Sequence, residues 1–273
     1  MTDFDVILLD LDGVVYIGPD PVPGAVEAIT ELVRRGTRCC YVTNNASRTP
    51  AQVAAHLRSF GLPATDDDVI TSSQAGAALV QGFVSDGEVL AVGGEGVRSA
   101  LAERGFEPVT RFTDRTVAVM QGYGPEVGWA DLAEATFAVR AGLPWVATNL
   151  DRTFPTPRGA APGNGALVHL VAQTAGRGPD AVAGKPEPAL LEEALRRTGG
   201  RRPLMVGDRL DTDIAAATRL GIPSLLVLTG IGDMAQARAA QGDEVGTYVA
   251  ADLGALLPGA RLDAWPGTVA GAR

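Results

Sequence analysis

Short, wholly apolar runs alternate along the chain with longer amphipathic stretches, and glycine-rich or polar turns separate the two. Apolar runs of this length are typical of strands buried on both faces, and the amphipathic stretches have the periodicity of helices that cover a sheet. The pattern predicts strands at 6–10, 38–43, 89–92, 116–121, 144–148, 181–183, 203–206 and 224–228. It predicts helices at 24–35, 50–60, 73–83, 96–104, 128–141, 164–174, 186–198 and 212–220.

This alternation favours an α/β fold whose core is a Rossmann-like, doubly wound parallel sheet. More strands are predicted than one small sheet needs, so we expect a second sheet. The segment from Leu257 onwards is rich in proline, glycine and alanine, and we expect it to be loosely ordered.

Composition and charge narrow the classes of function. The 273 residues suffice for one or two domains, with 46% hydrophobic and 20% charged residues. No apolar run approaches the roughly 18 residues of a membrane helix, and the acidic start, "MTDFD", predicts neither a signal nor a transit peptide. The formal charge of −9 argues against nucleic acid or an anionic membrane as the main partner. We therefore expect a cytoplasmic protein.

Cysteine and histidine contribute little chemistry. The two cysteines, Cys39 and Cys40, are neighbours in an apolar run, so we expect buried core residues rather than a disulfide framework. His56 and His169 lie within helical patterns and stand beside no H-E-x-x-H or G-x-S-x-G motif. Carboxylate chemistry is what remains.

Because ligands of parallel α/β sheets bind at the carboxyl ends of the strands, the residues that follow each strand are the informative ones. The first such segment is "DLDGV", in which Asp10 and Asp12 leave a strand and Gly13 permits a turn. These two carboxylates can share one cation, or act separately as a nucleophile and a proton shuttle. A strand that ends in a polar turn is the alternative.

The second segment is Thr43-Asn44-Asn45, which also follows a strand. Its hydroxyl, amides and backbone N–H groups suit an anion, and simple capping of the next helix is the alternative. The third is "AGKPEP". Lys185 stands unfavourably for the dipole of a helix that begins at Pro186, and an anion between the lysine and the helix start would explain it.

The fourth segment is "VGDRLDTDI". Asp208 follows a strand directly, whereas Asp211 and Asp213 fall in the first turn of the next helix, where Asp211 can serve as an N-cap. Together the four segments supply carboxylates for a hard cation such as Mg²⁺, a hydroxyl and one lysine. Phosphoryl transfer needs such a set.

The order and spacing of D-L-D-G-V, Thr43, G-K-P and G-D-x-x-x-T-D resemble the four motifs of the haloacid dehalogenase-type phosphohydrolases, and the match covers nearly the whole chain. The long stretch between the second and third motifs resembles the type IIA subgroup, with a C2a cap. That subgroup includes 4-nitrophenyl, phosphoglycolate and pyridoxal phosphatases and nucleotide-directed enzymes. Val14 departs from the threonine that many members carry.

The resemblance implies a role for each motif. Asp10 would be the nucleophile that forms an aspartyl phosphate, and Asp12 would act as the general acid and then as the general base. Thr43, Asn44 and Asn45 would bind phosphate, and Lys185 would neutralise charge on Asp10 and the phosphoryl oxygens. Mg²⁺ would be held by Asp10, by Asp12 through its backbone carbonyl, and by Asp208, with Asp213 supporting these ligands from outside.

The resemblance also implies a discontinuous core, 1–76 and 179–273, with a cap at 77–178. The cap segment "ATNLDRTFPTPRG" follows a predicted strand, and its Asn149, Asp151 and Phe154 are candidates for contacting the substrate; an exposed loop is the alternative. A second cap segment, "VGGEGVRS", fails the G-x-G-x-x-G fingerprint because Ser99 stands at the last position, and a tight turn is expected.

A Mg²⁺-dependent phosphomonoesterase for a small phosphorylated metabolite is the function that the sequence favours. The overall pattern is similar to actinobacterial enzymes that act on glycerol phosphate, and the cap loop has few aromatic or basic residues to hold a nucleobase. The alternatives are a nucleotide or pyridoxal phosphate phosphatase, a phosphotransferase, and a phospho-acceptor signalling domain without enzymatic activity. Neither a nucleic acid nor a membrane is expected as a partner. A homodimer formed through the cap is a further hypothesis.

Overall fold

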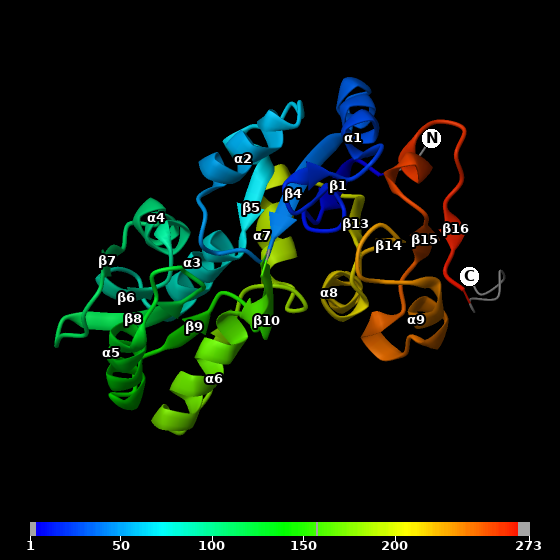
Figure 1. Ribbon diagram of the computed structural model, residues 1–273. Helices are drawn as coiled ribbons and strands as arrows, with labels where there is room; N and C mark the ends of the chain where they lie inside the picture. The colour runs from blue at the N-terminus through cyan, green and yellow to red at the C-terminus, as the bar shows by residue number, and fades with distance from the viewer. Residues whose placement is uncertain (1–3, 157, 267–273) are drawn as a thin grey trace. The chain divides into compact units, whose positions relative to one another are not determined.

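The computed structural model describes residues 4–156 and 158–266, without the side chains of residues 154 and 155. The chain divides into two compact units. The first unit contains residues up to Val42, Val53–Ile70 and the chain from Lys185 onwards, and the second contains Thr43–Gln52 and Thr71–Gly184. Each unit has a sheet of its own (Figure 1).

The first unit is built on a seven-stranded sheet in the order β16-β15-β14-β13-β1-β4-β5. Its central strands run parallel, and β16 pairs antiparallel with β15 at one edge. The strands are β1 (Val6–Leu9), β4 (Arg38–Thr43), β5 (Val69–Thr71), β13 (Pro203–Gly207), β14 (Ser224–Val227), β15 (Tyr248–Ala250) and β16 (Asp263–Ala264). A short hairpin of β2 (Tyr16–Ile17) and β3 (Asp20–Pro21) follows β1.

Alternate residues of these strands enter different apolar clusters, as expected for a sheet covered on both faces. Leu225 and Val227 of β14 pack in the cluster that includes α1, whereas Leu226 packs in the cluster that includes Trp265. The helices of this unit are α1 (Ala25–Arg34), most of α2 (Pro50–Ser59), α7 (Ala189–Thr198), α8 (Ala215–Leu220) and α9 (Met234–Ala239). A π-helical turn, Leu210–Ile214, leads into α8.

The second unit has a five-stranded parallel sheet in the order β12-β9-β8-β6-β7. Its strands are β6 (Glu88–Val92), β7 (Glu107–Val109), β8 (Thr116–Gln121), β9 (Trp145–Ala147) and β12 (Ala181–Val182). Its helices are α3 (Ser72–Phe83), α4 (Glu95–Glu103), α5 (Trp129–Arg140) and α6 (Asn164–Ala175), and β10 (Thr153–Thr156) and β11 (Gly159–Pro162) form an antiparallel hairpin.

This sheet is also covered on both faces. Val89 and Ala91 of β6 pack with residues of α3 and α4, whereas Leu90 and Val92 pack with residues of α5 and α6. The period-two alternation of buried residues thus divides the helices into two layers. The predicted α/β class with parallel sheets is confirmed. Within the described residues, no helix combines the length and the apolar character that a membrane crossing needs.

Most predicted elements lie within a few residues of the observed ones, and two expectations are wrong. The tail is not loosely ordered over its described part, because β16 pairs with β15 and Trp265 is buried; residues 267–273 lie outside the described chain. The helix expected from Pro186 begins at Ala189. The buried free thiols of Cys39 and Cys40 confirm their prediction as core residues, and burial raises the pKa of each to about 12.

Candidate active site

The site in the first unit lies where neighbouring strands end. Asp10 follows β1 and Asp208 follows β13, and the Asp10 N–H donates to the carbonyl of Val206 at 2.9 Å. Because β1 and β13 are paired in parallel, their carboxyl ends meet at one edge of the sheet. Asp213 reaches the same place from the π-helical turn, where its Oδ2 accepts the Arg209 N–H at 3.1 Å.

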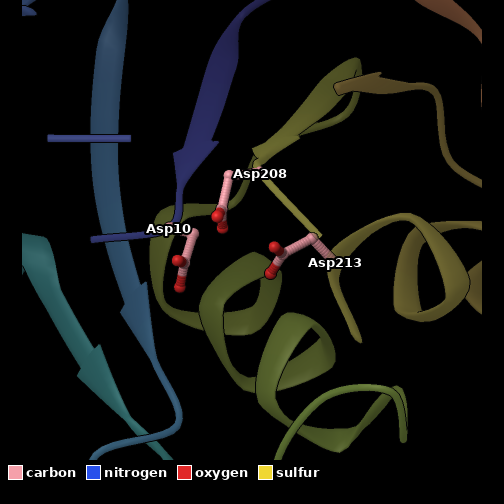
Figure 2. Close-up of side chains that lie close together, drawn as sticks. All are labelled: Asp10, Asp208 and Asp213. Carbon is pink, nitrogen blue, oxygen red and sulfur yellow. The ribbon is translucent and has the colours of Figure 1, made fainter. Parts of the chain in front are cut away.

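Figure 2 shows the carboxylates of Asp10, Asp208 and Asp213 close together, with one oxygen of each within 4.8 Å of the others. Lys185 forms ion pairs with Asp10 and with Asp213, the second at 2.7 Å, and its side chain is buried. Three carboxylates therefore face one ammonium group. When all are ionised, this cluster carries two more negative charges than positive ones, which a divalent cation would balance.

Burial sets the proton affinities of this cluster. It raises the pKa of Asp208 to about 6, and the neighbouring charge of Asp213 adds to this. Burial likewise raises the pKa of Asp10 well above its usual range, although the ion pair with Lys185 opposes the shift. For Lys185 itself, burial lowers the pKa, but the charges of Asp10 and Asp213 more than offset this and raise it overall. Lys185 is therefore a fixed cation.

The donor set fits a hard divalent metal ion. Within the described residues, the buried Oδ1 of Asp208 has no hydrogen-bond partner, whereas its Oδ2 accepts the Ile231 N–H at 2.7 Å. A buried carboxylate oxygen without a partner is costly unless a cation binds it. Carboxylate oxygens are the ligands that Mg²⁺ prefers. Asp213, predicted to support the metal ligands, lies in the same cluster, where its carboxylate pairs with Lys185.

Asp12 lies in a different environment from Asp10. It is exposed, and it belongs to the turn between Leu11 and Gly13. Gly13 has a φ of 83°, and a Cβ on it would lie 2.5 Å from Oδ2 of Asp208. The turn therefore requires glycine both for its left-handed backbone and for its close approach to Asp208. An exposed carboxyl beside a buried one is a suitable arrangement for a proton shuttle.

The surroundings of Lys185 differ from those expected. The strand that precedes it, β12, belongs to the sheet of the second unit, and no helix begins at Pro186. Lys185 therefore does not stand at the start of a helix, where its charge would oppose the helix dipole. Its position is explained by its carboxylate partners. Asp211 caps no helix, because its carboxylate pairs with Arg209 at 2.8 Å.

Sequence reasoning missed the loop after β14, "TGIG" (Thr229–Gly232). The Thr229 hydroxyl donates to the carbonyl of Gly13 at 2.6 Å. The Gly232 N–H donates to the backbone carbonyl of Asp208 at 2.8 Å, and the Ile231 N–H holds its carboxylate. This loop therefore fixes both Asp208 and the turn after Asp10. Its position after a predicted strand, at the same sheet edge, was the available signal.

The other predicted site residues lie together in the second unit. Thr43 ends β4, and its Oγ1 accepts the Asn45 N–H at 3.1 Å. The Asn44 side chain donates to Asp151 at 3.1 Å, and the Asn149 side chain donates to the Asn44 carbonyl at 2.8 Å.

The sixth candidate of the second unit is Phe154, whose backbone pairs with Ala161 in the β10–β11 hairpin; its side chain is outside the described part of the structure. The expected turn in "VGGEGVRS" is confirmed, because Gly94 lies directly before α4.

The fold and site define a parallel α/β protein with a lysine–carboxylate centre suited to a divalent cation. Residues 7–107 match the family described as haloacid dehalogenase-like hydrolase, and residues 182–256 match a second model of the same kind, HAD-hydrolase-like. The chain is 46% identical to D-glycerol 3-phosphate phosphatase of Mycobacterium tuberculosis over 261 residues, which cover 95% of this chain and 73% of that protein. It is 38% identical to the 5'-nucleotidase YutF of Bacillus subtilis over 226 residues, 82% of this chain and 87% of that one.

A solved structure extends the likeness to three dimensions. The glycerol phosphate phosphatase of Mycobacterium tuberculosis in complex with magnesium superposes with a TM-score of 0.89 at 47% identity, covering 94% of this chain and 77% of that one. The chain belongs to the haloacid dehalogenase-like hydrolases. The family predicted from the four motifs is confirmed. The prediction that the chain is one of the family's phosphatases is confirmed as well.

Proposed function

We propose that the chain is a Mg²⁺-dependent phosphomonoesterase that hydrolyses a small phosphorylated polyol, with glycerol 3-phosphate as the first candidate. The observation that carries the proposal is the cluster of Asp10, Asp208, Asp213 and Lys185, in which one buried oxygen of Asp208 has no hydrogen-bond partner among the residues that the structure describes. The similarity to glycerol phosphate phosphatases supports this substrate class.

In the proposed mechanism, an oxygen of Asp10 attacks phosphorus and the bond to the leaving oxygen breaks. Asp12 gives its proton to that leaving oxygen, so the alcohol departs neutral. Asp12, now a carboxylate, then takes a proton from water, and the resulting hydroxide displaces Asp10 from the aspartyl phosphate. Inorganic phosphate leaves and Asp10 is again a carboxylate.

The remaining residues hold charge and position. Carboxylate attack on a phosphate dianion meets like-charge repulsion, and Lys185 lowers it through its ion pair with Asp10. Asp10, Asp208 and the backbone carbonyl of Asp12 would hold Mg²⁺, with Asp213 beside them; the bound metal supplies further neutralisation of phosphoryl charge. Thr43, Asn44 and Asn45 are proposed to bind phosphate.

We further propose that 77–178, which lies wholly within the second unit, is the cap, and that 1–76 and 179–273 form the core. Within the cap, Asp151 and Phe154 are proposed to contact the leaving group. Asn149, the third candidate, belongs to the same segment. A homodimer through the cap is supported by Trp129 and Phe137 on α5, which are 81% and 56% exposed. A cytoplasmic location stays a prediction.

The test is phosphate release from a panel that contains glycerol 3-phosphate, 4-nitrophenyl phosphate, a nucleoside monophosphate and pyridoxal phosphate, each with Mg²⁺ and with EDTA. We expect release only with Mg²⁺ and the highest kcat/KM for the polyol phosphate. A higher value for the nucleotide would replace the proposed substrate. Release that EDTA leaves unchanged would contradict the metal requirement.

A further inference from the structure

The loop that follows β4, residues 44–48, is held by other segments of the second unit through its backbone carbonyls. The Asn44 carbonyl accepts two hydrogen bonds, from the Ser72 hydroxyl at 2.7 Å and from the Asn149 amide at 2.8 Å. The Ala46 carbonyl accepts the Ser73 hydroxyl at 2.8 Å, and a fourth donor, the Gly96 N–H, bonds to the next carbonyl of the loop at 3.1 Å. Donors from three separate segments therefore fix this loop.

The shape of the second unit also fixes the 44–48 loop. A Cβ on Gly94 would lie 2.7 Å from the carbonyl oxygen of Ser47, and a Cβ on Gly96 would lie 2.8 Å from the carbonyl carbon of Arg48. Both contacts are too close for any side chain. The "GGEG" sequence therefore lets the start of α4 pack directly on the backbone of the loop.

Asn149 is one of the donors that hold the 44–48 loop, and the sequence analysis predicted that it contacts the substrate. Its side chain is 4% exposed, and both ends of its amide are used: Nδ2 donates to the Asn44 carbonyl, and Oδ1 accepts the Asp151 N–H at 3.1 Å. Its own backbone carbonyl accepts the Asn164 amide at 2.8 Å. A buried amide with both ends engaged is suited to hold the backbone rather than to meet a ligand.

We propose that Asn149 and Ser73 are positioning residues for phosphate binding, which act by holding the 44–48 loop from the second unit. The inference rests on the proposed function, because it takes Thr43, Asn44 and Asn45 as phosphate ligands. Asn149 then sets the affinity for the phosphate group common to all substrates. Choice among leaving groups falls to other residues of the 149–154 segment.

The test compares Asn149→Ala and Ser73→Ala with the wild type. Each variant removes one hydrogen bond to the loop, which is worth about a fivefold to tenfold change in binding. We expect the inhibition constant of inorganic phosphate, and the KM of every substrate, to rise by this factor. The ratio of kcat/KM for glycerol 3-phosphate to that for 4-nitrophenyl phosphate, and the Mg²⁺ concentration for half-maximal activity, should both stay unchanged.

Thr136→Val is the matched control, because it removes a buried hydroxyl of the second unit that bonds within α5, to the Leu132 carbonyl. We expect it to leave the phosphate inhibition constant unchanged. If Asn149→Ala alters the substrate ratio while phosphate inhibition is unchanged, Asn149 contacts the leaving group and the proposal is wrong.

Hydrogen exchange of the loop amides separates this inference from the proposed function. Exchange at residues 44–48 should be faster in both variants than in the wild type and in Thr136→Val. Unchanged protection in the variants would overturn the positioning role. A wild-type protein that neither releases phosphate nor is inhibited by it would instead contradict the proposed function, whatever the exchange rates.

Discussion

The two units bury polar groups in opposite ways. The first unit buries charges: Lys185 and Asp213 form an ion pair, and Asp10 and Asp208 lie beside them. Around its candidate site residues, the second unit instead buries neutral groups, with the amide of Asn149 and the hydroxyl of Ser73 bonded to backbone carbonyls; its buried Glu88 pairs with Arg115 on another strand–turn segment. Neutral hydrogen bonds hold a loop in place without responding to pH or to a metal. A charged cluster responds to both.

This difference suggests that the first unit carries out the chemistry and that the second unit positions the groups that bind phosphate. Buried charges in low dielectric interact strongly, so the first unit can drive attack on phosphorus and hold a cation. The neutral network stabilises by about 1 kcal/mol for each hydrogen bond, which suits positioning. If this division is correct, substitutions in the first unit should affect turnover and metal binding, and those in the second should affect binding of phosphate and choice of substrate.

Asp10→Asn should have the largest effect. It removes the attacking carboxylate, and we expect phosphate release to fall by at least about 10³-fold. The measurement is steady-state phosphate release with saturating Mg²⁺. Asp67→Asn, at an exposed aspartate of the same unit, is the control and should retain full activity. Equal activity of the wild type and Asp10→Asn would contradict the nucleophile assignment.

Lys185→Met should show that charge balance holds the first unit together. The substitution leaves Asp10 and Asp213 without their buried cation, and we expect the free energy of unfolding in EDTA to fall by about 3 kcal/mol. Mg²⁺ should restore part of this loss. Urea unfolding in EDTA and in Mg²⁺ measures both. A variant as stable as the wild type in EDTA would show that the ion pairs do not stabilise the fold.

The Asp208 carboxyl should make stability depend on pH. Its pKa is about 6 in the folded protein against 3.8 for an ordinary aspartate, so between pH 4 and 6 the folded state holds the proton more tightly. The stability contributed by Asp208 therefore falls as pH rises through this window, by about 3 kcal/mol in total, and stays low above pH 6.

Urea unfolding in EDTA at several pH values measures this contribution as the difference between the wild type and Asp208→Asn. Carboxylates outside the cluster change stability in both proteins alike and cancel, whereas the pKa of Asp10, which the charge of Asp208 raises, belongs to the measured difference. A difference that does not vary between pH 4 and 6 would contradict the raised pKa. With Mg²⁺ present, the wild type should be stabilised more above pH 6, where the Asp208 carboxyl is ionised, than below it.

Thr229→Val should weaken the metal site without removing a ligand. The hydroxyl no longer holds the carbonyl of Gly13, and we expect the Mg²⁺ affinity to fall by about tenfold. Calorimetric titration of Mg²⁺ measures this directly. Thr218→Val removes a hydroxyl that also bonds to a backbone carbonyl of the same unit, that of Val245, and should leave the affinity unchanged. Equal affinities for all three proteins would contradict the role of the loop.

Asp151→Asn should have the smallest effect. It keeps an oxygen that can accept the Asn44 amide but removes a half-exposed charge, so we expect the ratio of kcat/KM between two leaving groups to change by about threefold. Phosphate inhibition should not change. A large loss of turnover would contradict the division between the units, because a residue of the second unit would then take part in the chemistry.

The parts of the fold that the sequence predicted have local causes. Strands such as Arg38–Thr43 and Thr116–Gln121 were predicted at their observed bounds because their residues alternate between two buried faces. Short strands such as Glu107–Val109 and Tyr248–Ala250 were missed, because three residues carry too little pattern. Trp265 was assigned to a loose tail, since its burial depends on strands far away along the chain.

By itself, the sequence determined the order of strands and helices and the chemical groups at the strand ends. The turn at Gly13, which directly follows Asp10-Leu11-Asp12, depends on residues that are neighbours in the chain. The family resemblance implied that Lys185 acts on Asp10, but only the tertiary structure brings the two together across 175 residues and places Asp213 in the same cluster. It also decided that Thr43–Gln52 belongs with the second unit. The physical reason is that local pattern fixes backbone conformation, whereas contacts between distant segments depend on how whole elements pack.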